Sequence, residues 1–412
     1  TNSGYTLDAQ TWKTVSTVGP SAPIQVTIRS ATVANGALTG GPWKGTDGNI
    51  QIAPVSAGGS VVYWTTSGGT VLKGFKLGDE SVVQVLSTGE AKTQCIACHT
   101  STPDGLFVGL TGSPDATDGG ALAFVDMRSE DGTGARPAYV TQNAYLLLGR
   151  SGQHAPTFSK AHWQTSDYMV LTMYELSTRS EIIWTDLESQ SPTQGSGWGI
   201  LARNSDVNEA ASAQFSHDGN SVVYTSATSV TSGVTSNDGR IYTIPYNSKQ
   251  GGTATPLAGA SDPSALQYYP AYSADDKFVA FDKVTAAGSG STYSNPQAEL
   301  YVVPAAGGTA TRLAANDPPT CTGVTSPGIS NSWPKWSPEA TSDAKGNTYY
   351  WLVFSSLRDP GQTTPAPQLY AAPIVVDANG NVTTYSALYF WNQPETEHNH
   401  TPAWDVFQIP AQ

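Results

Sequence analysis

Short apolar segments recur along the chain, and each follows the same kind of polar turn. A unit opens with a small residue or Pro, then an aromatic residue, then Ser or Asp, as in residues 156–159 and 402–405. Apolar and polar positions then alternate, which is typical of a β-strand. The pattern predicts first strands at 60–64, 221–224, 277–281 and 350–354, and second strands at 121–126, 182–186, 240–244, 299–303 and 368–372.

The units return roughly every 50 to 60 residues, and repeats of this length built only from strands indicate a β-propeller. Residues 1–49 and 393–412 remain outside six such units and together have about the length of one more. We therefore predict one all-β domain over 1–412, a seven-bladed propeller whose last blade is closed by both chain ends, with 24–28 as a strand. Six blades with an N-terminal extension is the alternative. The six units are placed at about 50–94, 95–150, 151–207, 208–264, 265–328 and 329–392.

The repeat resembles that of the TolB-like (WD40-like) propellers. Their repeat reads close to Pro-x-Trp-Ser-Pro-Asp-Gly before a strand, and residues 334–338 match it, with looser copies at 214–219 and 270–276. The resemblance spans about residues 50 to 404 and implies the propeller fold. Such propellers host binding proteins, peptidases and lyases alike, so the resemblance does not choose a function.

The composition agrees with a turn-rich β protein. Of the 412 residues, 38% are hydrophobic and 13% charged, and there are 41 Gly and 27 Pro. The net charge of −13 and the lack of a Lys/Arg cluster argue against a nucleic-acid partner, whose phosphates require a basic surface. No stretch approaches the ~20 apolar residues of a membrane-spanning helix, so we expect no membrane span.

Residues 95–99 read Cys-Ile-Ala-Cys-His, the attachment signature of a c-type haem. The thiols of Cys95 and Cys98 can add to the two vinyl groups of one porphyrin. The imidazole of His99 then lies under the ring, where it can ligate the iron. We therefore predict one covalently bound haem c. The alternatives are a disulfide or redox pair, a packed cysteine pair, or a site for another metal.

Alignment of the repeat turns places Cys95 and Cys98 just before an innermost strand, near one mouth of the channel, where propeller ligands generally bind. His154 and His400 align with Ala97 on other blades, and His398 lies two residues earlier. Two imidazoles must face each other across an iron, and His400 is two blades from His99 in a seven-bladed ring. We therefore rank His400 first, His154 second and His398 third as the sixth ligand, although His154 is equally explained as a hydrogen-bonded channel histidine.

Two further groups of residues bear on the predicted haem pocket. Methionine is the other common sixth ligand, but Met169 and Met173 share one strand face, which favours core packing. Tyr269 and Trp333 align with Cys98, where they could wall the haem or pack between blades.

The predicted function is that of an exported monohaem cytochrome, which transfers electrons to a redox partner protein. An open sixth iron position would instead allow oxidoreductase chemistry such as peroxide reduction. Haem attachment takes place outside the bacterial cytoplasm, so we expect a periplasmic, cell-surface or secreted protein whose signal peptide has been removed. The alternatives are a TolB-like module without haem that binds a peptide or glycan, and a metal-dependent polysaccharide lyase that uses the His cluster of 395–400.

Overall fold

The computed structural model describes six stretches of the chain and divides it into two compact units. One unit consists of Thr1–Ser56 with Ser342–Ala344, and the other of Ala57–Thr341 with Lys345–Gln412. Residue 121 of a predicted strand, and the ends 1–6 and 411–412 of the predicted closing blade, lie outside the described residues. The described stretches are 7–19, 22–115, 122–176, 179–285, 290–358 and 366–410.

In its described residues the first unit has one α-helix and two small antiparallel sheets. Its helix begins after Asp8, whose side chain accepts a hydrogen bond from the Thr11 N–H at 2.9 Å, a typical N-cap. Asn35 and Gly36 both have left-handed φ angles, as a two-residue hairpin turn between β2 and β3 requires. The elements are α1 (Ala9–Val18), β1 (Ile24–Val26), β2 (Arg29–Ala34), β3 (Ala37–Lys44) and β4 (Gly48–Ile50), with β1 paired to β4 and β2 to β3.

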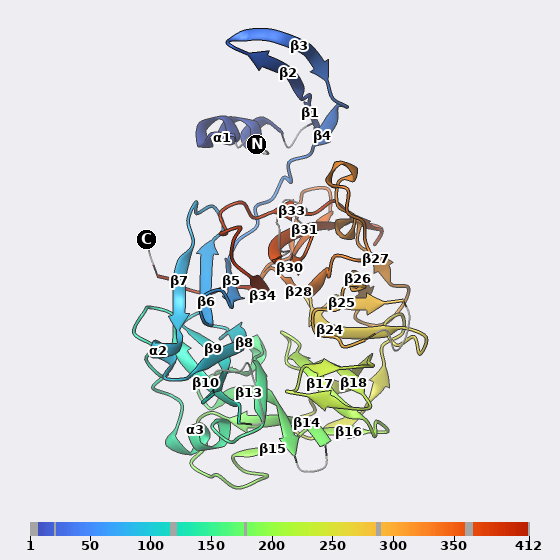
Figure 1. Cartoon of the computed structure of the whole chain (residues 1–412). Helices are drawn as coiled ribbons and strands as arrows, with labels where there is room; N and C mark the ends of the chain where they lie inside the picture. Colours follow the sequence, from blue (N-terminus) through green and yellow to red (C-terminus); the bar gives the residue numbers. More distant parts are fainter. Residues whose placement is uncertain are drawn as a thin grey trace. The chain divides into compact units, whose positions relative to one another are not determined.

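The second unit is a six-bladed β-propeller (Figure 1). Within each blade the strands are antiparallel, and the first strand given below lies innermost. Blade 1 is β34 (Asn399–Asp405), β5 (Ser60–Thr65), β6 (Val71–Lys76) and β7 (Val83–Ser87); blade 2 is β8 (Cys95–Ser101), β9 (Phe107–Ser113) and β10 (Phe124–Ser129); blade 3 is β11 (Gln153–Thr157), β13 (Asp167–Leu176), β14 (Arg179–Asp186) and β15 (Trp198–Ile200), with β12 (Trp163–Gln164) beside β13.

Blades 4 to 6 follow the same plan. Blade 4 is β17 (Glu209–Phe215), β18 (Ser221–Ala227), β21 (Arg240–Pro245) and β23 (Thr255–Pro256); blade 5 is β24 (Leu266–Tyr272), β25 (Phe278–Val284), β26 (Glu299–Pro304) and β27 (Thr311–Arg312); blade 6 is β28 (Ser332–Trp336), β30 (Thr348–Ser356), β31 (Gln368–Val376) and β32 (Val382–Thr384), with β33 (Leu388–Tyr389) beside β31.

Short elements complete the described chain. Among them β16 pairs with β22 in parallel, and β19 pairs with β20 in a small hairpin. The helical ones are single turns or little more. The elements are α2 (Thr88–Ala91), α3 (Gln142–Leu148), the 3₁₀ helices η2 (Lys160–His162), η3 (Ala314–Asn316) and η4 (Thr320–Thr322), and strands β16 (Ala202–Asn204), β19 (Val230–Thr231), β20 (Thr235–Ser236), β22 (Gly251–Thr253) and β29 (Thr341–Ser342).

The ring is closed by the C-terminal strand alone. β34 pairs with β5 from Asn399 opposite Thr65 to Asp405 opposite Ser60, so the end of the chain completes blade 1. The predicted seventh blade is therefore wrong, and the six-bladed alternative is confirmed. The predicted closing strand 24–28 is β1, which pairs with β4 in the first unit instead. Strands β2 and β3 are exposed along almost their whole length and cannot form a blade, whose two faces are covered by its neighbours.

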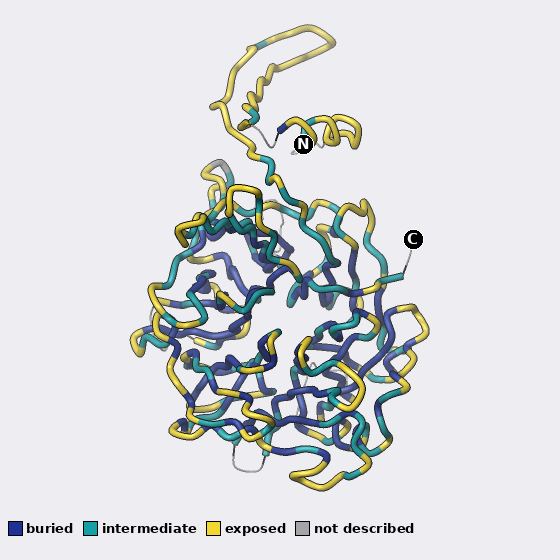
Figure 2. The backbone as a smooth tube through the Cα atoms, turned by 180° about the vertical axis from the view of Figure 1, so that it is seen from behind, coloured by how far each residue is buried: buried dark blue, intermediate teal, exposed yellow. Residues whose placement is uncertain are grey.

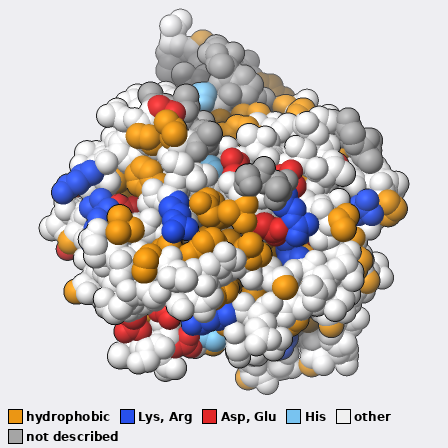
Figure 3. All heavy atoms as spheres, turned by 90° about the horizontal axis from the view of Figure 1, so that it is seen from below, with side chains coloured by type: hydrophobic (Ala, Val, Ile, Leu, Met, Phe, Trp, Pro, Cys, Tyr) orange, Lys and Arg blue, Asp and Glu red, His pale blue; other side chains and the backbone are white. Residues whose placement is uncertain are grey.

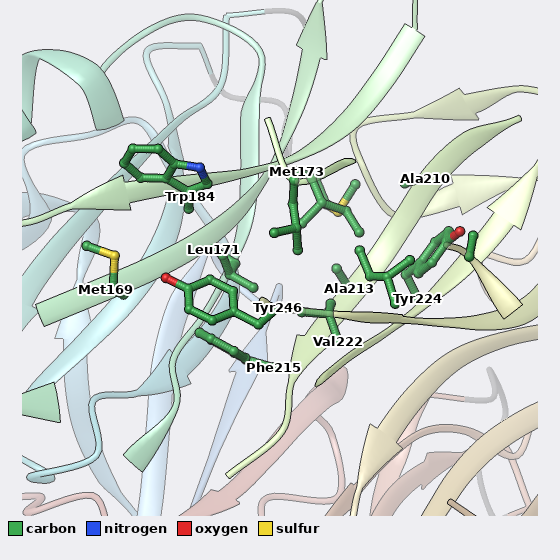
Figure 4. Packing of buried hydrophobic residues seen from close by; sticks show 14 residues of the cluster. Met169, Leu171, Met173, Trp184, Ala210, Ala213, Phe215, Val222, Tyr224 and Tyr246 are labelled. Atoms are coloured by element: carbon green, nitrogen blue, oxygen red, sulfur yellow. The ribbon is translucent and has the colours of Figure 1, made fainter. Parts of the chain in front are cut away.

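The propeller core lies between neighbouring blades, and its strands are largely buried (Figure 2). Between blades 3 and 4, Met169, Leu171 and Met173 of β13 pack with residues such as Phe215 and Tyr224 (Figure 4). Met169 and Met173 are 0% exposed, which confirms the prediction that these methionines pack in the core. No described helix is long and apolar enough to cross a bilayer.

One face of the molecule shows how the charges are distributed (Figure 3). Hydrophobic side chains gather near its middle, and Lys and Arg side chains lie in separate patches, some of them beside Asp or Glu side chains.

Candidate functional site

Six equivalent positions surround the channel, one on the innermost strand of each blade. Each strand carries a bulge at this point, where it has one residue more than the strand paired with it. Together these positions form what we call the ring: Cys98, Ala155, Ser212, Tyr269, Trp333 and Thr401.

Five of the six ring residues share an unusual backbone conformation. Their φ angles lie between 45° and 62°, in the left-handed region that side-chain-bearing residues seldom adopt. Four of the five are followed by Pro, which has no N–H to donate to the sheet and disfavours the right-handed helical region in the residue before it. Cys98 is the exception, because its φ is not left-handed and His99 follows it. The ring confirms the sequence alignment of Cys98 with Tyr269 and Trp333.

The ring encloses a cavity, which we call the channel cavity. It is lined by the ring and by polar residues that follow it in sequence, among them Thr157, Gln214 and Lys335. A second cavity overlaps it at the mouth and is lined by Trp64, Tyr293 and several hydroxyl groups, together with Cys98, Trp333 and Thr401. The mouth therefore combines aromatic faces with a thiol and hydroxyls, which suits a ligand with both apolar and polar parts.

A stacked aromatic pair dominates one wall of the mouth. The rings of Tyr269 and Trp333 are 3.7 Å apart between centroids, with 15° between their planes. Tyr293 meets Trp333 edge to face at a centroid distance of 6.3 Å. Beneath them, Oδ2 of Asp282 accepts hydrogen bonds from the Ser332 hydroxyl and, at 3.4 Å, from the Trp333 N–H. Burial raises the pKa of Asp282 well above its usual range, whereas the hydrogen bonds from Ser332 and Trp333 lower it.

The Cys-x-x-Cys-His motif lies within strand β8, not just before it as the alignment predicted. Cys95 is 1% exposed and points to the strand face opposite Ile96, which packs between blades 1 and 2. Cys98 lines the channel cavity. His99 turns toward blade 1, where its Nε2 lies 3.1 Å from the Val62 carbonyl oxygen.

The side chains of Cys95, Cys98 and His99 point in three different directions from β8, which does not suit their attachment to one porphyrin. At about 3.3 Å per residue, the α-carbons of Cys95 and Cys98 are roughly 10 Å apart in an extended strand. Neither cysteine forms a disulfide. Covalent haem attachment would require residues 95–99 to leave β8. Ile96 and His99 would then lose their burial.

Burial keeps three of the four histidines near this end of the channel neutral at pH 7. It lowers the pKa of His99, His154 and His400 to about 4 each. For His99 the bond to Val62 opposes this shift and the charge of Lys335 adds to it. His398 is exposed, and its backbone N–H bonds the Ser67 hydroxyl at 2.9 Å.

These three histidines, of which His99 and His154 are buried and His400 is half-buried, lie in different surroundings. The imidazole of His400 stacks on Trp64 at a centroid distance of 4.8 Å, between blades 1 and 2. His154 lies against Gly233 of blade 4, with its Nε2 3.8 Å from Oε1 of Glu175. In a six-bladed ring both histidines lie on blades next to that of His99, so the reason for ranking His400 above His154 is wrong. Among the described residues, no group of three His, Cys, Asp or Glu side chains is placed to hold one metal ion.

Sequence reasoning missed two residues of the site. Lys335 is part of the repeat phrase at 334–338, and Asp282 directly follows the predicted strand 277–281, so the fold alone explained both positions. For Lys335 the available signal was a charged residue at a position that is Thr, Gln or Ala on the other innermost strands.

No family model and no curated protein matches this chain. Among solved structures, it is similar to a protein assigned as TolB from Agrobacterium tumefaciens, with 15% identity, a TM-score of 0.43, and 84% of this chain and 97% of that chain covered. A chain of a nidogen/laminin complex is similar at 10% identity and a TM-score of 0.45, with the same coverage, 84% and 97%.

An oligogalacturonate lyase in complex with manganese is similar at 10% identity and a TM-score of 0.38, covering 81% of this chain and 75% of that chain. At such scores the evidence for the propeller fold rests on the strand pairing described above.

Proposed function

We propose that this protein is a binding module of the TolB-like propeller type, which holds part of a peptide or glycan at the mouth of its channel. The observation that supports it most is the ring, because six blades bring an aromatic pair, a thiol and several hydroxyls to one cavity. Aromatic faces pack against apolar or ring-shaped groups, while the hydroxyls select among polar edges.

The rigidity of the ring favours binding without large rearrangement. Its residues lie on the innermost strands of the blades, between buried inter-blade cores. A site built on such elements is pre-organised, which lowers the entropic cost of association.

Blocking the mouth tests this function. Thr401→Trp places an indole at a ring position whose left-handed backbone already carries Trp and Tyr on other blades, so the fold should tolerate it. Wild-type protein is screened on peptide and glycan arrays, and the best binders are titrated. We expect Thr401→Trp to abolish their binding, and the control Leu146→Trp, at a side chain 59% exposed on α3, to preserve it. Retention of binding in Thr401→Trp, or arrays without any binder, would overturn the proposal.

The haem protein is a second candidate, supported by the residues of the motif itself. It implies attachment through Cys95 and Cys98, ligation by His99, electron transfer with a redox partner, and an address outside the cytoplasm. It also requires residues 95–99 to adopt a conformation different from β8.

Colour and thiol reactivity separate the two candidates. Protein from a host with haem-attachment machinery should show a Soret band that survives acid-acetone extraction if haem is bound covalently. A binding module should be colourless, and Cys98 should react with a maleimide far faster than the buried Cys95. If haem is found, an unchanged low-spin spectrum of His400→Ala would exclude His400 as a ligand and favour His154.

A further inference from the structure

The channel cavity contains one ammonium group without a fixed counter-ion. Lys335 of β28 lines it two residues after Trp333. In the described part of the chain, none of the ion pairs within 4.0 Å includes Lys335. Burial lowers its pKa, whereas Cys98 and Asp405 raise it. A cation in such a place is costly unless an anion joins it.

Asp405 does not take the place of that anion. Its Oδ1 accepts a hydrogen bond from the Val406 N–H at 2.8 Å. Burial raises the pKa of the Asp405 carboxyl, and Asp405 does not line the channel cavity. The positive charge of Lys335 therefore faces the cavity without an anionic partner at contact distance.

Other donors lie at the same level of the channel. Gln214 occupies the position on β17 that Lys335 occupies on β28, and its Oε1 accepts the Tyr272 N–H at 2.8 Å. This bond assigns the amide oxygen, so the Nε2 hydrogens of Gln214 are left to donate. Thr157, equivalent on β11, accepts the Phe215 N–H at 3.2 Å and keeps its hydroxyl proton for a further bond.

The positive charge that lines the channel cavity at the level of Lys335 matches one negative charge on a ligand. Lys335 and His99 are the only ionisable nitrogen-bearing side chains lining the described channel cavity, and His99 is neutral at pH 7 because its pKa is about 4. A phosphate dianion would exceed the one positive charge, whereas a carboxylate balances it and accepts bonds from ammonium, amide and hydroxyl donors.

We propose that the channel cavity binds a carboxylate group at Lys335, Gln214 and Thr157, while an aromatic or similarly planar part of the same ligand lies against Trp333. The inference rests on the proposed binding function and names the chemistry of its ligand. A free small acid and the C-terminal carboxylate of a peptide present the same group.

Calorimetric titration with matched probes tests the inference. Benzoate and N-acetylphenylalanine carry the carboxylate, and benzamide and N-acetylphenylalanine amide lack it. We expect both acids to bind and both amides to fail. Lys335→Met should weaken acid binding about tenfold or more, since a charge-assisted hydrogen bond is lost. The control Lys277→Met removes an equal charge at a side chain 68% exposed and should leave binding within about twofold.

Tighter binding of N-acetylphenylalanine than of benzoate assigns the site to a peptide terminus, and the reverse order assigns it to a free acid. Equal binding of acid and amide, undiminished binding by Lys335→Met, or no binding of either acid at millimolar concentration would each overturn the inference. An array ligand lost in Thr401→Trp but unaffected by Lys335→Met would leave the binding function standing and remove only the carboxylate.

Discussion

The innermost strand of blade 2 differs from the other five at the position where they are most alike. On β11, β17, β24, β28 and β34 the ring residue is left-handed, and Pro or Ala follows it. On β8 the ring residue is Cys98, its φ is not left-handed, and the next residue, His99, still pairs with Leu110. The bulge is common to all six strands, and four of them have Pro after the ring residue, whereas β17 has Ala213 and β8 has the imidazole of His99.

This difference shows that the motif replaces a repeat element and does not interrupt the fold. Pro156 lies close to Gly109 of the preceding blade, and His99 likewise turns to the preceding blade, toward Val62. The imidazole therefore fills the place of a proline ring and adds one hydrogen bond. Whether residues 95–99 serve the fold or a haem can be tested through the stability of β8.

The largest effect is expected for Ile96→Ala. Ile96 is 0% exposed between blades 1 and 2, so removal of its side chain should lower the free energy of unfolding by about 3 kcal/mol. Denaturant titration measures this loss, with Leu106→Ala, at a side chain 47% exposed, as a control expected within about 0.5 kcal/mol. A loss below about 1 kcal/mol would mean that residues 95–99 leave the strand, as a haem would require.

His99→Ala should come next. It converts the β8 sequence at this position to that of β17, where Ala213 follows the ring residue. Because His99 is 9% exposed and bonds the Val62 carbonyl, we expect a loss of about 2 kcal/mol in unfolding free energy. The exposed His398, changed to Ala, is the matched control, and equal effects of the two changes would contradict the buried role of His99.

The buried histidines predict a pH dependence of stability. Burial lowers the pKa of His154 from 6.5 to about 4, so between these values the unfolded chain binds a proton that the folded chain does not. Stability therefore falls as the pH decreases from 6.5 to 4, by up to about 1.4 kcal/mol per pH unit for this residue.

His154→Gln should reduce that slope by the same amount in denaturant titrations at several pH values. Burial raises the pKa of Glu130 to about 9, and its opposite contribution cancels in the difference between wild type and variant. An unchanged slope would show that His154 is already protonated or exposed in the folded protein.

The smallest expected effect distinguishes a left-handed ring residue, Ala155, from Cys98, which is not left-handed. Ala155 has a φ of 47°, so Ala155→Gly should relieve strain and raise stability by about 0.5 kcal/mol in thermal or denaturant unfolding. Cys98→Gly relieves no such strain and should lower stability by about 0.5 to 1 kcal/mol. The same sign for both changes would show that β8 does not differ from β11 in the way described.

Much of the fold could be predicted from local patterns. Strands such as 60–64 and 368–372 were visible because apolar residues repeat where blades cover both faces of a sheet. The turns also aligned Cys98 with Trp333 and His400 with Ala97, because a repeated phrase fixes equivalent positions in equivalent blades. Residues 1–49 led to the wrong prediction of a seventh blade, because with 393–412 they have about the length of one blade. Their strands β2 and β3 are exposed, however, and the strands of a blade are largely buried.

The sequence by itself determined the repeat, the all-β class and the level at which Cys98, His99 and His400 lie, because these depend on spacing along the chain. Only the tertiary structure decided the number of blades, the three directions of Cys95, Cys98 and His99, and the meeting of Lys335 with Gln214 in one cavity. These depend on which blades become neighbours around the ring and on the bulge that turns each side chain, and both are set by packing between strands far apart in sequence.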